Sequence, residues 1–189
     1  MTLAILAMAD EAAPETQLHD FQALYEEHSK SVFLTALRVT GNPADAEDVL
    51  QTVFARILDT RPELDDSRAP GAYLRRAATN AAIDLLRRKK TRGESEIDES
   101  RLAGRGLRVA GPGVTGSIDA TAREESFVLK DRLRAALAEL STENAELFVL
   151  CYLEGYSYDE LADLLGLERG TVASRLHRTR AKLQEELSR

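Results

Sequence analysis

The stretch that decides the fold prediction is residues 157–180, which read SYDELADLLGLERGTVASRLHRTR. It begins with Ser157 and has Glu160 three residues later, which is the spacing of a capping box at the start of a helix. A Gly-Leu-Glu turn follows, and apolar residues at helical spacing resume beyond it. Two short helices joined by such a turn are typical of a helix-turn-helix. We therefore predict one helix over 157–165 and a second over 169–187.

The 169–187 helix is predicted to have an apolar face and a cationic face. Projection at about 100° per residue places most of its Val and Leu side chains in one arc, opposite long cations and small hydroxyls. Such a cationic face suits a DNA major groove, because Arg reads guanine or pairs with phosphate and short side chains allow close approach. A solvated charged face is the alternative, but no acid balances this basic run. The predicted duplex DNA contacts are Thr171, Ser174, Arg175, His177, Arg178, Arg180 and Lys182.

A second basic helix is predicted over 70–90, within a segment from Arg68 to Arg92 that holds eight bases and one acid. One stripe of this helix combines an aromatic ring, an amide and cations. The ring can stack on an unpaired base, the amide can pair with a base edge, and the cations can hold the backbone. A solvated face with ion pairs four residues apart explains the same pattern, so the residues alone leave both interpretations open. The stripe and its basic extension comprise Tyr73, Arg76, Asn80, Asp84, Arg87 and Arg88.

The net charge of the chain is −7, from 32 acidic and 25 basic side chains, and this total by itself argues against a nucleic-acid binder. The charge is unevenly distributed, however. Residues 139–168 carry eight acids and no base, and they lie between the two basic helices. The chain therefore has two basic segments in an acidic background, a pattern that the total charge does not reveal. We expect such an acidic surplus to keep a free DNA-binding chain off bulk DNA.

The predicted helix over 42–58 presents a separate polar surface. Asn42 is its expected N-cap, and Pro43 occupies the first helical position, where a missing N–H costs nothing. Apolar residues then recur at steps of three and four, so we expect one buried face. The exposed face is predicted to carry Asp45, Asp48, Gln51 and Thr52.

The chain as a whole is predicted to be all-α, because helical spacing recurs and no useful strand-like alternation occurs. We divide it into a disordered tail at 1–17, a helical bundle at 18–90, a flexible linker at 91–122 and a helix-turn-helix bundle at 123–189. The linker assignment rests on six of the eleven glycines of the chain. We thus expect two small bundles on a tether.

Nothing in the sequence points to catalysis, a metal or a cofactor. The three histidines and the one cysteine, Cys151, are too dispersed for a metal site, and no Gly-rich phosphate loop or nucleophile motif occurs. A single cysteine also excludes an internal disulfide, which fits a reducing cytoplasm. We expect a cytoplasmic, non-enzymatic protein in which Cys151 is a small core residue.

Three segments resemble those of bacterial RNA polymerase sigma factors of the extracytoplasmic-function type. Residues 45–54, DAEDVLQTVF, resemble the core-binding helix of that family, and residues 73–88, YLRRAATNAAIDLLRR, resemble its promoter −10 helix. Residues 150–162, LCYLEGYSYDELA, followed by residues 170–180, GTVASRLHRTR, resemble its −35 helix-turn-helix. The last pair is shared with other regulators, whereas all three segments in this order are highly specific.

The resemblance implies a protein that binds RNA polymerase core and directs it to promoters without any bond chemistry of its own. Asp48, Gln51 and the surrounding 45–55 helix would bind the β′ clamp helices, with the β subunit as a further contact. The 73–88 stripe would capture unpaired −10 bases, and the cationic face of the last helix would grip the −35 duplex. An anti-sigma protein is a further implied partner. The family commonly has Trp at Ile57 and Tyr73, Pro at Ser141 and Lys at Ala173.

Two alternatives stay open, one within DNA binding and one from a different class. A stand-alone helix-turn-helix regulator would recognise an operator without polymerase, although neither a heptad dimer seam nor a sensor domain is visible in the sequence. The N-terminal bundle could instead be an interaction module whose acidic helix meets a basic partner. DNA binding by the isolated chain separates these alternatives from a sigma factor, which binds promoters with core enzyme.

Overall fold

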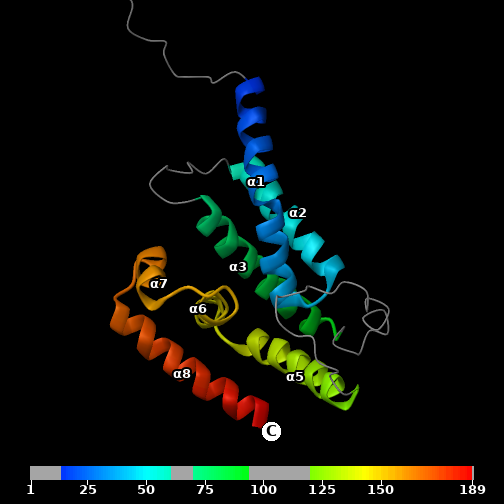
Figure 1. Ribbon diagram of the computed structural model, residues 1–189, viewed down its shortest axis with the longest axis vertical. Coiled ribbons are helices and arrows are strands. Elements are labelled where there is room, and N and C mark those ends of the chain that lie inside the picture. Colours follow the sequence, from blue (N-terminus) through cyan, green and yellow to red (C-terminus); the bar gives the residue numbers. More distant parts are fainter. Residues whose placement is uncertain (1–13, 61–69, 94–119, 189) are drawn as a thin grey trace, which may run out of the picture.

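The computed structural model describes residues 14–60, 70–93 and 120–188, and within these ranges the regular structure is helical, without strands (Figure 1). An N-terminal unit contains α1 (Pro14–Thr40), α2 (Pro43–Thr60) and α3 (Pro70–Thr91). A C-terminal unit contains α5 (Ala120–Glu139), α6 (Thr142–Tyr152), α7 (Tyr158–Leu165) and α8 (Arg169–Ser188). The all-α prediction is confirmed.

Two predicted non-helical segments fall largely outside the described residues. Helix α1 begins at Pro14, so the last four residues of the tail predicted at 1–17 are helical, and the remainder of that tail is not described. Most of the linker predicted at 91–122 is likewise not described, but α5 begins at Ala120, three residues before its predicted start.

The turn between α1 and α2 follows from three consecutive residues. Gly41 has a φ of +70°, which glycine adopts without the steric cost that a side chain would add. The Oδ1 atom of Asn42 accepts a hydrogen bond of 2.8 Å from the backbone N–H of Ala44, and Pro43 is the first residue of α2. The predicted N-cap is confirmed, and the tight turn lets α2 fold back against α1.

The N-terminal unit is a three-helix bundle in which α1 packs against both α2 and α3. Helix α2 buries the predicted apolar face between Ala46 and Phe54, whereas Leu58 in its last turn is 50% exposed. Helix α3 buries a wide part of its surface, because Ile83 and Leu86 are buried in addition to Leu74. The additional burial arises because α3 is contacted by helices of both units.

The helix-turn-helix in the C-terminal unit is built as its sequence indicates. Ser157 and Glu160 form the capping box, which adds a 2.8 Å hydrogen bond from the Ser157 N–H to Glu160 Oε2. These hydrogen bonds, mainly that from the backbone, lower the pKa of Glu160. Gly166 ends α7 in the left-handed conformation, with a φ of +64°, and the chain turns into α8. A small core that includes Leu161, Val172 and Leu176 holds α6, α7 and α8 together.

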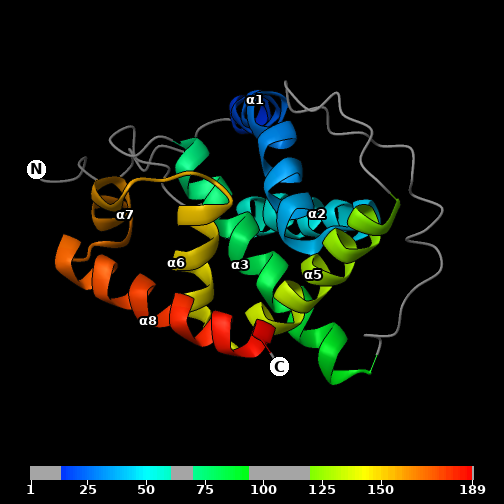
Figure 2. The ribbon, with the colours of Figure 1, turned by 60° about the horizontal axis from the view of Figure 1, so that its bottom comes forward.

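The two units are not separate bundles in this structure. Helices α5 and α6 pack along α3, which lies between them and the other helices of the N-terminal unit (Figure 2). Leu137, Leu140 and Val149 of the C-terminal unit belong to the same buried cluster as Leu74 and Ile83 of α3. The two predicted helical domains therefore pack against each other, and one hydrophobic core crosses the boundary between them.

Candidate nucleic-acid interface

Helix α8 has the two faces that its sequence predicts. Val172, Leu176, Thr179 and Leu183 are buried, which fixes the helix on the C-terminal unit. The opposite face is open to solvent along most of its length. Of the predicted contacts, the exposed residues are Ser174, His177, Arg178, Arg180 and Lys182, and the half-buried residues are Thr171 and Arg175.

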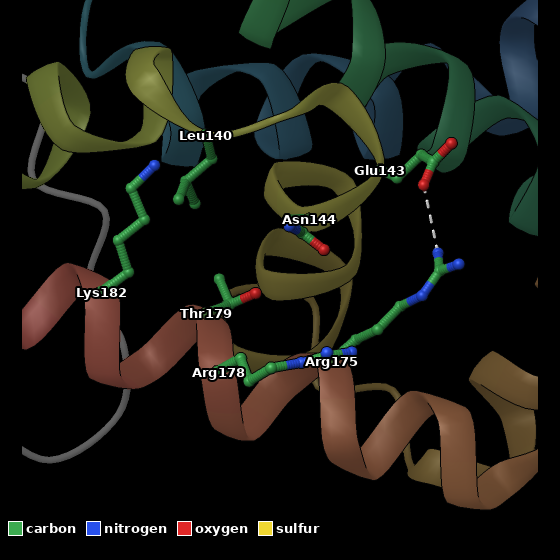
Figure 3. Close-up of a pocket in the computed structure, with 7 residues that line it drawn as sticks. All are labelled: Leu140, Glu143, Asn144, Arg175, Arg178, Thr179 and Lys182. Carbon is green, nitrogen blue, oxygen red and sulfur yellow. Dashed lines mark hydrogen bonds and ion pairs between the residues drawn. The ribbon is translucent and has the colours of Figure 1, made fainter.

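A cleft of about 420 Å³ lies between α6 and the cationic side of α8 (Figure 3). Arg175 extends across it, and its Nη1 atom lies 3.2 Å from Glu143 Oε2. The Thr179 hydroxyl is buried beside the cleft without a hydrogen-bond partner. Arg178 and Lys182 also line the cleft, so one wall of it is strongly basic. Phosphate oxygens suit this wall, because guanidinium and ammonium groups are their usual partners.

The predicted stripe on α3 is continuous along the helix but is partly covered. Tyr73 and Asp84 are exposed, at 42% for the Tyr73 residue and 50% for the Asp84 side chain. Arg76 and Asn80 instead contact one carboxylate of α6: the Nε atom of Arg76 donates to Glu146 Oε1 at 2.6 Å, and Asn80 Nδ2 donates to the same oxygen at 2.9 Å. The C-terminal unit therefore packs on the middle of the stripe, a contact that neither interpretation of the sequence included.

Arg87 lies further along α3 and is also engaged. Its guanidinium donates to Thr142 Oγ1 at 2.6 Å and to the Leu140 carbonyl at 2.7 Å, and it lies 3.5 Å from Asp84. Asp84 therefore forms an ion pair with a neighbouring arginine of the same helix. Arg88, next to Arg87, is exposed.

The polar face of α2 differs from its prediction at one residue. Asp48 and Gln51 are exposed and Thr52 is half-buried, with its hydroxyl bonded to the Asp48 carbonyl. Asp45 is only 5% exposed, and its carboxylate pairs with Lys89 of α3 at 2.6 Å. The prediction of an exposed Asp45 is wrong, because this residue lies at the edge of the α2 face that packs on α3.

Sequence reasoning did not identify the acidic residues of the C-terminal unit that bind the N-terminal unit: Glu146 contacts α3 and Glu154 contacts α1. Glu146 and Glu154 have side chains that are only 8% and 3% exposed. A signal was present in the acid-rich segment 139–168, since a carboxylate is rarely buried without a cationic partner. The periodicity of one helix does not state which distant helix supplies that partner.

Other kinds of site find no support in the described part of the chain. Within it, no group of His, Cys, Asp and Glu could hold a metal ion, and no helix is long and apolar enough to cross a membrane. Cys151 packs against the small C-terminal core, and burial raises the pKa of its thiol. It is half-buried, not fully enclosed.

Together, a helix-turn-helix with an exposed cationic second helix and a separate helix with aromatic, amide and cationic side chains define a DNA-binding transcription factor. Residues 24–92 match the family described as Sigma-70 region 2, and residues 130–183 match the family described as Sigma-70, region 4. The chain belongs to the extracytoplasmic-function (ECF) subfamily of the sigma-70 family. As a sigma factor it binds RNA polymerase core and directs promoter recognition in transcription initiation, and it is not an enzyme.

Relatives of known function agree over nearly the full chain. The chain is 30% identical to the ECF RNA polymerase sigma factor SigE of Mycolicibacterium smegmatis, over 97% of this chain and 67% of the relative. It is 34% identical to the ECF RNA polymerase sigma factor SigL of Mycobacterium tuberculosis, over 88% of this chain and 86% of the relative. Among solved structures, CnrH in complex with the cytosolic domain of CnrY matches with a TM-score of 0.51 and 27% identity, covering 90% of this chain and 89% of CnrH.

Proposed function

We propose that this ECF sigma factor divides its work among three helices: α2 binds polymerase core, α3 recognises the −10 element and α8 binds the −35 element. The observation that carries the proposal is the amphipathic arrangement of α8. Most of its cations are exposed to solvent, while its apolar face packs on the C-terminal unit. The corresponding domains are 18–90 for core and −10 binding and 123–189 for −35 binding.

Helix α8 is suited to duplex DNA. It is the second helix of a helix-turn-helix, the element that enters the major groove in proteins of this type. Arg175, Arg178 and Arg180 supply planar donors for guanine or phosphate, and Thr171 and Ser174 keep the N-terminal half of the face narrow enough for close approach. The proposed contacts add His177 and Lys182 to these.

Helix α3 is suited to single-stranded DNA. The exposed Tyr73 ring offers a stacking platform for an unpaired base. Asn80 can pair with a base edge, and its Oδ1 atom is buried without a hydrogen-bond partner although its Nδ2 donates to Glu146. Half of this amide is therefore unsatisfied, which supports a role with a further partner. Arg76, Arg87 and the exposed Arg88 supply backbone contacts.

Helix α2 is suited to a protein partner. Asp48 and Gln51 are exposed on one side of a helix whose other side is buried in the bundle. We assign these two residues and Thr52 to the β′ clamp helices of the core enzyme, and the β subunit to a further contact with the chain. Asp45 is a structural residue in this assignment, since its carboxylate holds Lys89.

The proposed mechanism is selection of an open state. The C-terminal unit docks on −35, and α3 holds melted −10 bases by stacking and edge recognition. Binding to the melted strand alone shifts the equilibrium toward open DNA, since a ligand favours the state to which it binds more tightly. Polymerase core supplies the catalysis. The site of action is the cytoplasm, and the solved complex of CnrH with CnrY supports a regulatory protein partner for this chain as well.

The experiment that tests the proposal is transcription in vitro with core polymerase on fragmented genomic DNA, followed by sequencing of the transcripts. The wild-type chain is expected to select a set of start sites that share −10 and −35 sequences. Asn80→Ala is expected to lower transcription from these sites about tenfold, in line with the loss of one base-specific contact, and to leave core binding unchanged. Gln22→Ala, on the exposed surface of α1, is the matched control. Unaltered transcription by Asn80→Ala would contradict the −10 assignment.

A stand-alone regulator gives a different result in the same system. It shifts specific DNA by itself, and adding core polymerase changes neither its site preference nor its affinity. Asp48→Ala separates the roles further: we expect weaker binding to the β′ subunit in a pull-down and unchanged binding of α8 to duplex DNA.

A further inference from the structure

The cleft between α6 and α8 is a local concentration of positive charge (Figure 3). Its lining includes the cations Arg175, Arg178 and Lys182 and the acid Glu143, so its ionised side chains sum to +2. The chain as a whole has a net charge of −7. A hollow lined by surplus positive charge attracts anions even when the rest of the protein surface repels them.

Thr179 points to a ligand in this cleft. The residue is 3% exposed, and its hydroxyl lies beside the cleft with no hydrogen-bond partner in the part of the chain that the structure describes. A threonine hydroxyl inside a helix often donates to the carbonyl four residues earlier, as Thr52 and Thr91 do in α2 and α3. A buried polar group without a partner is unfavourable and uncommon in native proteins. An acceptor that enters the cleft would satisfy this hydroxyl.

The cations on either side of Thr179 are available to a ligand. Arg178 and Lys182 are exposed, and within the described ranges neither side chain forms an ion pair or a hydrogen bond. Arg175 differs, because its Nη1 atom lies 3.2 Å from Glu143, whose side chain is 74% exposed. An ion pair with an exposed carboxylate is weak, so an anion in the cleft can compete for Arg175 as well.

The amino end of α6 forms the opposite wall of the cleft. Helix α6 begins at Thr142, and its N-cap residue, Ser141, makes no side-chain capping hydrogen bond. Glu143 and Asn144 of the first turn line the cleft. The N–H groups at the start of a helix carry partial positive charge and favour anions. The unpartnered hydroxyl and the cations of α8 therefore face a helix end that suits the same kind of ligand.

We propose that this cleft is a binding site for a phosphate group. Arg178, Lys182 and the Thr179 hydroxyl donate to the phosphate oxygens from α8, and the amino end of α6 faces the group from the other side. A phosphate accepts several hydrogen bonds and carries about one to two negative charges near neutral pH, which the cleft lining balances. The group belongs either to the −35 DNA backbone or to a phosphorylated small molecule, and the first case rests on the proposed function of α8.

The test is NMR titration of the isotope-labelled full chain with inorganic phosphate at constant ionic strength. We expect saturable shifts of the amide signals of Thr179 and Glu143, which chloride does not produce. Thr179→Val keeps the shape of the side chain and removes the hydroxyl. It is expected to weaken phosphate binding about tenfold, as for the loss of one hydrogen bond to a charged group.

Two variants control this titration. Thr179→Ser keeps the hydroxyl and is expected to bind phosphate nearly as the wild-type chain does. Thr79→Val is the matched control, because Thr79 is also buried with an unpartnered hydroxyl but does not line the cleft. Circular dichroism establishes that each variant keeps its helices. Absence of the shifts in the wild-type chain, shifts that chloride reproduces, or equal phosphate binding by Thr179→Val would overturn the proposal.

Binding of the holoenzyme to a selected promoter separates the two sources of the phosphate. Weaker promoter binding with Thr179→Val, but not with Thr79→Val, assigns the site to the −35 backbone. Unchanged promoter binding together with lost phosphate binding assigns it to a phosphorylated small molecule. Failure of the −35 function is seen separately, because Arg180 does not line the cleft. Unaltered promoter binding by Arg180→Ala would contradict the assignment of α8 to −35 DNA, whatever the phosphate titration shows.

Discussion

The two basic helices of this sigma factor, α3 and α8, differ in whether their cations are exposed to solvent or bound by the other unit. The cations of α8 are mostly exposed to solvent. Arg175 is half-buried, and it forms an ion pair with Glu143 of its own unit; the Glu143 side chain is 74% exposed. The cations in the middle of α3 are engaged by the other unit: Arg76 pairs with Glu146, whose side chain is 8% exposed, and Arg87 donates to Thr142. The difference teaches that local charge alone does not define an available DNA surface, because the packing of distant helices decides which cations are free.

The largest effect is expected from a substitution in the hydrophobic core that the two units share. Leu137→Ala removes a side chain that is 1% exposed in the cluster joining the units, and we expect a loss of about 2–5 kcal/mol in the free energy of unfolding. Urea denaturation followed by circular dichroism measures it. Leu58→Ala, at a residue 50% exposed, is the control and is expected to have a much smaller effect. Equal effects of the two substitutions would contradict a core that crosses the boundary.

The next largest difference is expected between Glu146, which binds α3, and Glu143, which binds α8. Glu146→Ala leaves the Arg76 and Asn80 donors without their acceptor in a half-buried place, and we expect it to cost about 1–3 kcal/mol of stability. Glu143→Ala removes an exposed partner of Arg175 and is expected to cost about 0–1 kcal/mol. Denaturation of both variants under the same conditions measures the difference. A larger loss for Glu143→Ala than for Glu146→Ala would reverse the contrast between α3 and α8.

A smaller effect is expected at the capping box of α7, the helix that packs against α8 in the same unit. Ser157→Ala removes the side chain of the capping box at the start of α7, and such N-cap losses cost about 1 kcal/mol. The same substitution raises the pKa of Glu160 part of the way to its ordinary value, because the backbone hydrogen bond from residue 157 remains. Titration by NMR measures that change. An unmoved Glu160 pKa would contradict the role of the Ser157 hydroxyl.

The elements that sequence could predict are those governed by local rules. The buried faces of α2 and α8 follow from residues such as Val49 and Leu176 at helical spacing, and the helix starts follow from Asn42 and Ser157. These features depend on neighbours within a few positions along the chain. The resemblance to sigma factors likewise rested on contiguous segments.

The packing of the two units on each other could not be predicted in the same way. The acid-rich segment and the basic helix were both visible, yet the bond from Arg76 to Glu146 joins residues 70 positions apart. Helical periodicity states which side of α3 is polar, and it does not state whether water, DNA or another helix meets that side. Asp45 illustrates the same limit. Its carboxylate is buried against Lys89, a residue of another helix, and the spacing of residues within α2 does not indicate this partner.

The most direct test of the account is the distance between the two units, measured by energy transfer between dyes. Cysteines replace the exposed residues Glu47 of α2 and Gln184 of α8, in a chain carrying Cys151→Ala. The account predicts one short distance in the free chain, because the two units share a buried core. A long or broadly distributed distance in the free chain would contradict the claim that the C-terminal unit packs on α3 and covers part of its basic stripe.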